Sequence, residues 1–278
     1  MFNDGLWLRS GEFSAMTTIL QLVDDHFATL GATDVLDFGD GYSRLLKPDR
    51  ASGTALDHLL KAFAEVLAAS GLAAWRHVNY STFRHLFEQI EAQIEVPVIL
   101  ETGSSAHGTN SSMLFAALAE VTGGRFDTVD INPATVGRVA AALNGRYGQS
   151  PRLRTHCGDS VQFIHSFEGA APNVAYLDSF DLDPGHFDES AQHGLREFEC
   201  LIPKLACGTS LILIDDTPRS REIFRKMCPP AYLTAVDAHH AKTGRLPGKG
   251  ELVVEAIRSD HRFTILDWEY QLLLAYSS

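Results

Sequence analysis

Short apolar runs alternate with amphipathic segments along the chain from residue 96 onward. Runs such as VPVILE and RFDTVDI have the length and the β-branched content of buried strands, whereas PATVGRVAAALNGRY carries apolar residues three and four positions apart, as a helix does. Each strand-like run precedes a helical segment, and the runs begin at residues 96, 125, 152, 173 and 209. This alternation predicts a parallel sheet with helices on both faces.

The two ends of the chain depart from this alternation. ELVVEAI (251–257) and RFTILDWEYQLLLAY (262–276) look like two further strands, which would pair antiparallel at one edge. Residues 1–95 predict a helical extension, because apolar residues recur at helical spacing in the stretches 14–30, 53–70 and 81–94. We therefore expect an α/β, Rossmann-like, mostly parallel seven-stranded sheet with helices on both faces in residues 96–278, and a helical N-terminal cap in residues 1–95.

Two segments have the pattern of a strand that runs into a nucleotide-binding loop: VLDFGDGYSRLL (35–46) and VILETGSSAHGTNSS (98–112). Such a loop needs a helix directly after it and a second strand that ends in an acid. Pro48 and Gly53 interrupt any helix after the first segment, so we interpret Asp37–Gly41 as a turn. The second segment is followed by a helical stretch and then by a strand that ends at Asp130, so it is the predicted binding loop.

The spacing of this loop indicates the kind of ligand. Dinucleotide loops place backbone N–H groups on a pyrophosphate, but here the pattern is Glu101-x-Gly103-x4-Gly108, with an acid where a phosphate would approach. Gly103 allows a tight turn and Gly108 a close approach of the backbone. A carboxylate favours a cationic ligand, and S-adenosyl-L-methionine (SAM) carries a sulfonium and an amino group but no phosphate.

With these motifs in order, residues 96–278 resemble the class I SAM-dependent methyltransferases. Glu101, Gly103 and Gly108 match the first glycine-rich motif, although four residues separate the two glycines, which departs from its commonest forms. Asp130 matches the acid that binds the ribose hydroxyls, and Gly158-Asp159-Ser160 matches the motif that contacts adenine. The resemblance implies that SAM is held by Glu101, Thr102, Gly103, Ser104, Gly108, Ser111, Asp130, Ile131, Asp159, Ser160 and Asp178.

A second group of acids follows the next two strands. Asp178 ends the fourth strand, and Asp215 and Asp216 end the fifth. Parallel strands end at the same edge, so three carboxylates would repel one another there unless a cation lay between them, and oxygen ligands suit Mg²⁺, Mn²⁺ or Ca²⁺. The alternative is that Asp178 caps a loop and that Asp215 and Asp216 cap the helix near Pro218.

This pattern of acids resembles the metal-dependent O-methyltransferases of the catechol and macrolide-sugar types. The resemblance implies Asp178, Asp215 and Asp216 as ligands of a divalent metal, Mg²⁺ first among them. The catechol type has a lysine base three residues after its first metal ligand, and this chain has Asp181 there. We expect Asp181 or His186 to act as the base.

The other histidines near these motifs have weaker claims to a catalytic role. His107 lies in the binding loop, and His193 shares a helix face with Glu197 four positions away. His239 and His240 lie in AVDAHHAKTGRLPGKGE, a polar, glycine-rich stretch that we interpret as a mobile substrate lid. For each of the 12 histidines, an ordinary place on the surface or in the core remains the alternative.

Charge and composition narrow the partners and the compartment. Lys and Arg total 23 against 35 Asp and Glu, a formal net charge of -12, which disfavours a nucleic-acid partner. The sequence predicts no membrane span and no secretory signal, and its four cysteines, which form no C-x-x-C pair, indicate reduced thiols and a cytoplasmic location. The helical N-terminal part could pair with a second copy, which leaves a homo-oligomer open.

These observations together predict a SAM-dependent methyltransferase that transfers the methyl group to oxygen of a small hydroxylated metabolite, such as a sugar or a secondary metabolite, with help from a divalent metal. A metal-independent methyltransferase acting on nitrogen or carbon is the first alternative. A metal-dependent hydrolase and a non-catalytic SAM-binding module are the others, because related sheets host many functions.

Overall fold

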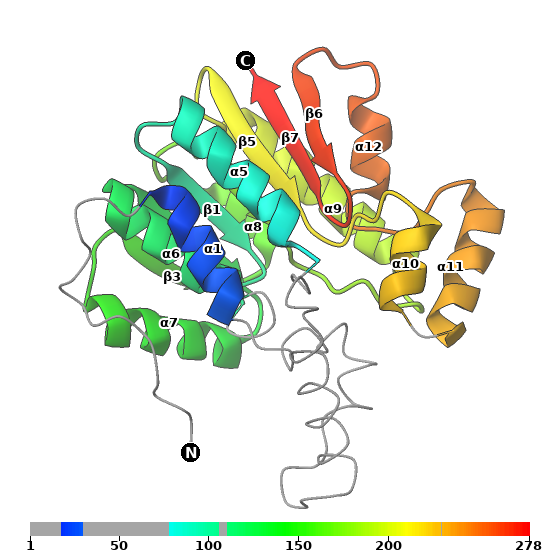
Figure 1. Ribbon diagram of the computed structural model, residues 1–278, viewed down its shortest axis with the longest axis horizontal. Coiled ribbons are helices and arrows are strands. Elements are labelled where there is room, and N and C mark those ends of the chain that lie inside the picture. The colour runs from blue at the N-terminus through cyan, green and yellow to red at the C-terminus, as the bar shows by residue number, and fades with distance from the viewer. Residues whose placement is uncertain (1–17, 30–77, 106–109, 229) are drawn as a thin grey trace, which may run out of the picture.

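A seven-stranded sheet with strand order β3-β2-β1-β4-β5-β7-β6 lies at the centre of the computed structural model, which describes residues 18–29, 78–105, 110–228 and 230–278 (Figure 1). The first five strands are parallel, and β7 runs antiparallel between β5 and β6. The strands are β1 (Val98–Thr102), β2 (Arg125–Asp130), β3 (Leu153–Cys157), β4 (Val174–Leu177), β5 (Thr209–Ile214), β6 (Phe263–Trp268) and β7 (Leu272–Ser277).

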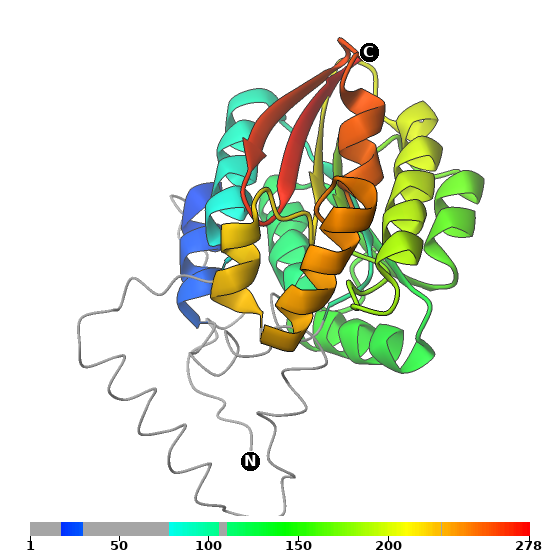
Figure 2. The ribbon, with the colours of Figure 1, turned by 90° about the vertical axis from the view of Figure 1, so that its right-hand side faces the viewer.

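Helices cover both faces of the sheet, and Figure 2 shows the resulting three layers from the side. The helices on one face are α1 (Ile19–Thr29), α5 (Tyr80–Gln93), α6 (Ser111–Thr122) and α7 (Pro133–Tyr147). The helices on the other are α8 (Ser160–Ser166), α9 (Phe187–Leu201) and α12 (Glu251–Ile257), and a 3-10 turn (Ile202–Lys204) follows α9. Two further helices, α10 (Arg221–Met227) and α11 (Pro230–Thr243), pack with the start of α9 in a small apolar cluster of their own.

The central strands show why the two-sided sheet forms. Every residue of β4 is buried, and its side chains alternate between the two cores: Val174 and Tyr176 face one side, Ala175 and Leu177 the other. A continuous apolar run of this kind is stable only where helices cover both faces. The sheet and its two helical layers therefore match the fold class that the sequence predicts.

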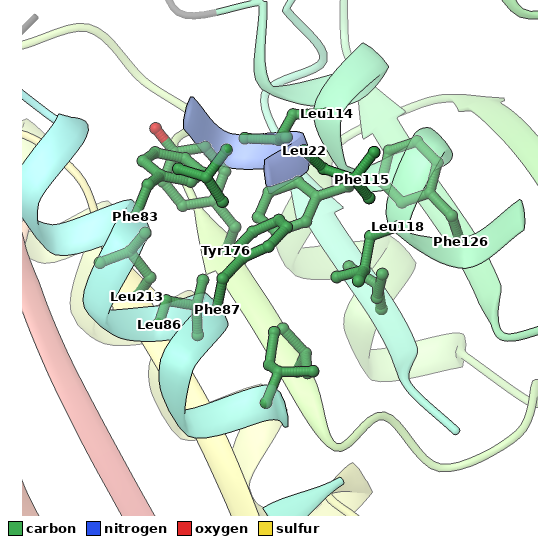
Figure 3. Close-up of a cluster of buried hydrophobic side chains, with 14 of the residues drawn as sticks. Leu22, Phe83, Leu86, Phe87, Leu114, Phe115, Leu118, Phe126, Tyr176 and Leu213 are labelled. Atoms are coloured by element: carbon green, nitrogen blue, oxygen red, sulfur yellow. The ribbon is translucent and has the colours of Figure 1, made fainter. Parts of the chain in front are cut away.

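An aromatic group from α5 and α6 packs onto this sheet and fixes one residue of the candidate site (Figure 3). The ring of Tyr176 lies 5.3 Å from that of Phe83 and 5.6 Å from that of Phe115, measured between centroids. Such ring pairs add to the free energy of burial. Because its ring is locked in the core, the Tyr176 hydroxyl has a fixed position at the carboxyl end of the neighbouring strand.

The prediction for the C-terminal part is wrong in two places. ELVVEAI is not a strand but the helix α12. Val253 and Ile257, four positions apart, both enter the core on the face of the sheet that α8 and α9 cover. The antiparallel pair at the end of the strand order is instead a hairpin over residues 263–277, in which a short turn joins β6 to β7. Residues 230–243 form α11, so the proposed lid begins as a helix.

Two of the three N-terminal helical stretches are confirmed, as α1 and α5, and both pack on the same core as α6. The turn at Asp37–Gly41, the stretch 53–70, His107 and Gly108 lie outside the described residues. The boundary between a cap and a sheet domain at residue 95 stays a prediction. No helix within the described ranges has both the length and the apolar character that a membrane crossing requires.

Candidate active site

The carboxyl ends of the five parallel strands lie side by side, and backbone hydrogen bonds tie the loops that leave them. Gly103 N–H donates to Val129 O at 2.9 Å, and Gly158 N–H donates to Asp130 O at 3.0 Å. On the other side of β1, Asp178 N–H donates to Thr102 O at 3.0 Å. These contacts place the predicted cofactor motifs and the predicted acid cluster along one edge, where ligands bind in open α/β sheets.

Gly103 makes the turn after β1 that the sequence predicts. Its φ of +78° lies in the left-handed region, and a Cβ at this position would come closer than 3.0 Å to the backbone of Asp178 and Ser179. Only glycine therefore allows β1 to end so close to the loop after β4. Thr102 and Ser104, on either side, are buried, and Ser104 shares a 2.7 Å hydrogen bond with Thr128.

Glu101 lies inside the protein and not at the surface formed by the carboxyl ends of the strands. Its carboxylate is fully buried and accepts hydrogen bonds from the hydroxyls of Ser111 (2.6 Å), Ser112 (2.5 Å) and Thr128 (2.7 Å). Burial raises the pKa of Glu101 to about 7, although the three hydroxyl bonds oppose that rise. Glu101 and Ser111 thus join α6 to β1 and β2.

The end of β2 presents an acid beside an exposed apolar side chain. One oxygen of the Asp130 carboxylate accepts the backbone N–H of Asn132 at 2.6 Å, and partial burial raises the pKa of this acid. The Ile131 side chain next to it is 73% exposed. At the end of β3, Asp159 caps α8 through a bond from Gln162 N–H at 2.9 Å, and Ser160 is buried near Ser179 and His193.

The three acids at the ends of β4 and β5 lie together, as the sequence predicts. The Tyr176 hydroxyl lies 2.7 Å from Asp215 Oδ2 and 3.2 Å from Asp178 Oδ2, and Gln271 Nε2 donates to Asp215 Oδ1 at 2.9 Å. Asp216 accepts from the Tyr270 hydroxyl. Burial raises the pKa of Asp178 and of Asp215, and the neighbouring carboxylates add to the effect.

A lysine lies between two of these acids. The Lys249 ammonium donates to Asp178 Oδ1 at 2.5 Å and to the Asp178 carbonyl at 3.1 Å, and it lies 3.0 Å from Asp216 Oδ2. The residue is 2% exposed, whereas the side chains of Asp178 and Asp216 keep 19% and 18% of their surface exposed. The carboxylates, not the ammonium, are therefore the groups that a ligand can reach.

Comparisons with known proteins identify relatives by structure only. No family model and no curated protein matches this sequence. Among solved structures, a candidate caffeoyl-CoA O-methyltransferase from Staphylococcus aureus is similar over 86% of this chain and 98% of its own, with a TM-score of 0.50 and 17% identity. The O-methyltransferase from Bacillus cereus in complex with SAH is similar over 91% of this chain and 100% of its own, with a TM-score of 0.44 and 19% identity. The SAH-bound methyltransferase PaMTH1 from Podospora anserina is similar over 86% of this chain and 95% of its own, with a TM-score of 0.46 and 15% identity.

The chain has a methyltransferase fold. At 17% identity the Staphylococcus aureus structure shares the architecture, and the seven-stranded sheet with its antiparallel β7 agrees with that architecture. The likeness extends over nearly the whole of that protein, so it is not confined to one motif.

Within this methyltransferase fold, the predicted metal site is not supported. The Lys249 ammonium already contacts Asp178 and Asp216, and Asp215 is held by Tyr176 and Gln271. A divalent ion at this point would need several of the same oxygens and would lie against a positive charge. Across the ranges that the structure describes, no set of three or more His, Cys, Asp or Glu side chains is arranged to hold a metal ion.

The two candidate bases lie in the loop between β4 and α9. Asp181 is exposed and close enough to Asp130 for its charge to raise the pKa of that acid. The His186 side chain is 61% exposed, and its ring nitrogen lies 3.9 Å from Asp183. Both face solvent near the edge, so their catalytic role stays a prediction.

Two of the other histidines, His193 and His239, are held by their neighbours. His193 Nε2 lies 2.9 Å from the Ser179 hydroxyl, and Ser179 donates to the buried Glu197 at 2.6 Å. His239 is buried and contacts Glu251 at 2.9 Å. The stretch that we interpreted as a mobile lid therefore consists, around His239 and Lys249, of the packed helix α11 and a packed loop.

Sequence reasoning missed Lys249, although it quoted the stretch that contains it. The residue lies 71 positions after Asp178, in the segment PGKG between α11 and α12. A lone lysine between two glycines gives no periodic signal, so only the fold reveals its partners. The glycines themselves were the available sign that the backbone comes close to another element here.

Proposed function

We propose that this protein is a SAM-dependent methyltransferase that acts on oxygen of a small hydroxylated metabolite. One observation carries the proposal. The Gly103 turn and the Asp130–Ile131 pair share a single sheet edge with the acid cluster at the ends of β4 and β5, in a methyltransferase fold. This shared edge supports a cofactor side and an acceptor side that lie next to each other.

On the cofactor side, each residue has a role that fits its chemistry. Asp130 would accept hydrogen bonds from the two ribose hydroxyls, since one of its oxygens is already oriented by Asn132. Ile131, exposed at the end of β2, would cover one face of the adenine ring, a contact that removes apolar surface from water. Gly103 would let the backbone approach the methionine part of SAM.

On the acceptor side, the partly exposed carboxylates of Asp178 and Asp216 would receive hydrogen bonds from acceptor hydroxyls. The acceptor oxygen would attack the methyl carbon in line with the carbon–sulfur bond. That bond breaks as the new carbon–oxygen bond forms, and the hydroxyl proton passes to a base, for which Asp181 and His186 remain our candidates. The proposal contains no metal step. The net charge of -12 makes a small molecule a better acceptor than a nucleic acid.

Calorimetric titration with SAM tests the cofactor side. We expect wild-type protein to bind SAM and Asp130→Ala to lose most of that binding, because two charge-assisted hydrogen bonds to ribose disappear. Asp260→Ala is the matched control: Asp260 also accepts the backbone N–H two residues ahead, from Arg262 at 3.0 Å, but it lies just before β6, at the far side of the sheet.

Equal SAM binding by wild type and Asp130→Ala would remove the cofactor assignment, and no binding by wild type would remove the proposal. Where SAM binds, labelled methyl transfer to panels of alcohols, amines and carbon acids then separates oxygen, nitrogen and carbon acceptors. Methylated amines as the main product would favour the metal-independent N-methyltransferase that the sequence left open.

A further inference from the structure

The Lys249 ammonium makes two hydrogen bonds and one further ion pair within the acid cluster. An ammonium has three N–H groups, and its three oxygen neighbours are the Asp178 carbonyl (3.1 Å), Asp178 Oδ1 (2.5 Å) and Asp216 Oδ2 (3.0 Å). At 2% exposure, Lys249 is a buried charge, and a buried charge is stable only when it is paired and hydrogen-bonded. Lys249 is therefore an integral part of the acid cluster.

The loop around Lys249 is fitted closely to β5 and α9. Its backbone N–H donates to Asp216 O at 3.0 Å, and the next N–H, of Gly250, donates to Thr217 Oγ1 at 3.0 Å. A Cβ on Gly248 would come within 2.7 Å of Asp216 O, and a Cβ on Gly194 of α9 would come closer than 3.0 Å to Lys249 O. The glycines let the backbone descend far enough for the ammonium to enter between the two acids.

The other oxygens of the cluster are also assigned to donors. Tyr270 donates to Asp216, Tyr176 lies between Asp215 and Asp178, and Gln271 donates to Asp215. These donors come from β4 and from the turn that joins β6 to β7, so the arrangement is fixed by the sheet itself. One cation and three neutral donors thus surround three carboxylates.

We propose that the Lys249 ammonium takes the place of a divalent cation in this site. It offsets the charge of Asp178 and Asp216 and holds them in position, so the cluster neither needs nor admits a metal ion. Lys249 is then a positioning residue, because it is too deeply buried to touch an acceptor. The link to methyl transfer rests on the proposed function, whereas the exclusion of metal does not.

Mn²⁺ binding, measured by electron paramagnetic resonance on the full chain, tests this inference without any substrate. We expect wild-type protein to bind no Mn²⁺ at this site. Lys249→Ala and Lys249→Met should each bind Mn²⁺ at least about tenfold more tightly than any residual binding by wild type, because the buried ammonium is removed and two carboxylates are released. Adding Asp216→Asn to Lys249→Ala should abolish the gain.

Lys242→Ala is the control for net charge. Lys242 pairs with Asp188 at 2.7 Å on the surface, so its loss releases a carboxylate elsewhere and should leave Mn²⁺ binding unchanged. Mn²⁺ binding by wild type that Asp216→Asn removes would overturn the inference, and this arm holds even where a Lys249 variant does not fold. So would folded Lys249 variants that gain no binding. SAM calorimetry on the same samples reports separately on the proposed function.

Discussion

At the scale of single residues, Glu101 differs most from its expected role. The sequence places it in a cofactor loop as a partner for a cation, but its carboxylate is enclosed by three hydroxyls from α6 and β2. The Glu101 carboxylate therefore sets the position of the loop between β1 and α6, because its hydrogen bonds fix where α6 begins relative to β1. Position in a motif is visible in a sequence, whereas the direction in which a side chain points is not.

Glu101 makes a testable contribution to the pH dependence of stability. Its pKa rises from 4.5 to about 7 on burial, so the folded protein binds this proton more tightly than the unfolded chain does. The stabilisation is fully present below pH 4.5 and is lost as the pH rises through about 7. It amounts to about 3 kcal/mol at most. Glu101→Gln should therefore show a flatter decline in the free energy of unfolding across this range, measured by urea denaturation.

Glu91→Gln, an exposed change in α5, is the control and should keep the wild-type slope. Asp178 and Asp215 have raised pKa values too and give the wild type a slope of the same sign, so the informative quantity is the difference between the two variants. Parallel curves for Glu101→Gln and wild type would show that the carboxyl is not shielded from water.

At the scale of elements, the parallel part of the fold was predictable and the C-terminal part was not. β1, β4 and β5 carry apolar runs that only a two-sided sheet can bury, and the helix PATVGRVAAALNGRY begins and ends where its pattern indicates. The prediction for ELVVEAI was wrong because a stretch of seven residues is too short to distinguish the helical period of hydrophobic residues from the strand period. Its helical state is set by tertiary contacts, including those of Glu251 with His239 and Arg245.

The same limit applies to the candidate site. Strand-end acids are predictable, because parallel strands end together, and Asp178, Asp215 and Asp216 do lie together. What fills the space between them depends on a loop that lies between two helices absent from the prediction, α11 and α12. The strand-end acids led us to expect a divalent metal between them, whereas in the structure the Lys249 ammonium contacts Asp178 and Asp216.

The packing of α9 against the Lys249 loop gives a second prediction. Gly194→Ala should lower the free energy of unfolding by about 1–3 kcal/mol, because the added Cβ would overlap the backbone of Lys249. Gly145→Ala in α7 is the matched control, since a Cβ there meets no atom within 4 Å, and it should stabilise the helix by about 0.5–1 kcal/mol. Chemical denaturation of both variants measures the contrast. If both changes stabilise the protein equally, α9 and the loop are not in contact.

At the scale of the whole molecule, the residues that stabilise the fold lie apart from the residues of the candidate site. Both cores lie on the faces of the sheet, whereas the candidate site lies at the carboxyl ends of the strands (Figures 1 and 2). Tyr176 connects the two, because its ring is in the core and its hydroxyl is among the acids. Ligands at this edge can therefore change without any change in the packing that maintains the fold.

This separation predicts where SAM should slow hydrogen exchange. Bound SAM stabilises the folded state by about 2.7 kcal/mol at a concentration of 100 times its Kd, so backbone amides at the edge should become more protected. We expect the strongest effect in residues 102–105, 130–132 and 158–160, which leave β1, β2 and β3 at the cofactor side. β6 and α12 should change only as far as the whole molecule is stabilised. Asp130→Ala should remove the local effect, and Asp260→Ala should preserve it. Protection centred on β6, at the other end of the strand order from β3, would instead place SAM away from β1–β3 and contradict the assignment of the cofactor side.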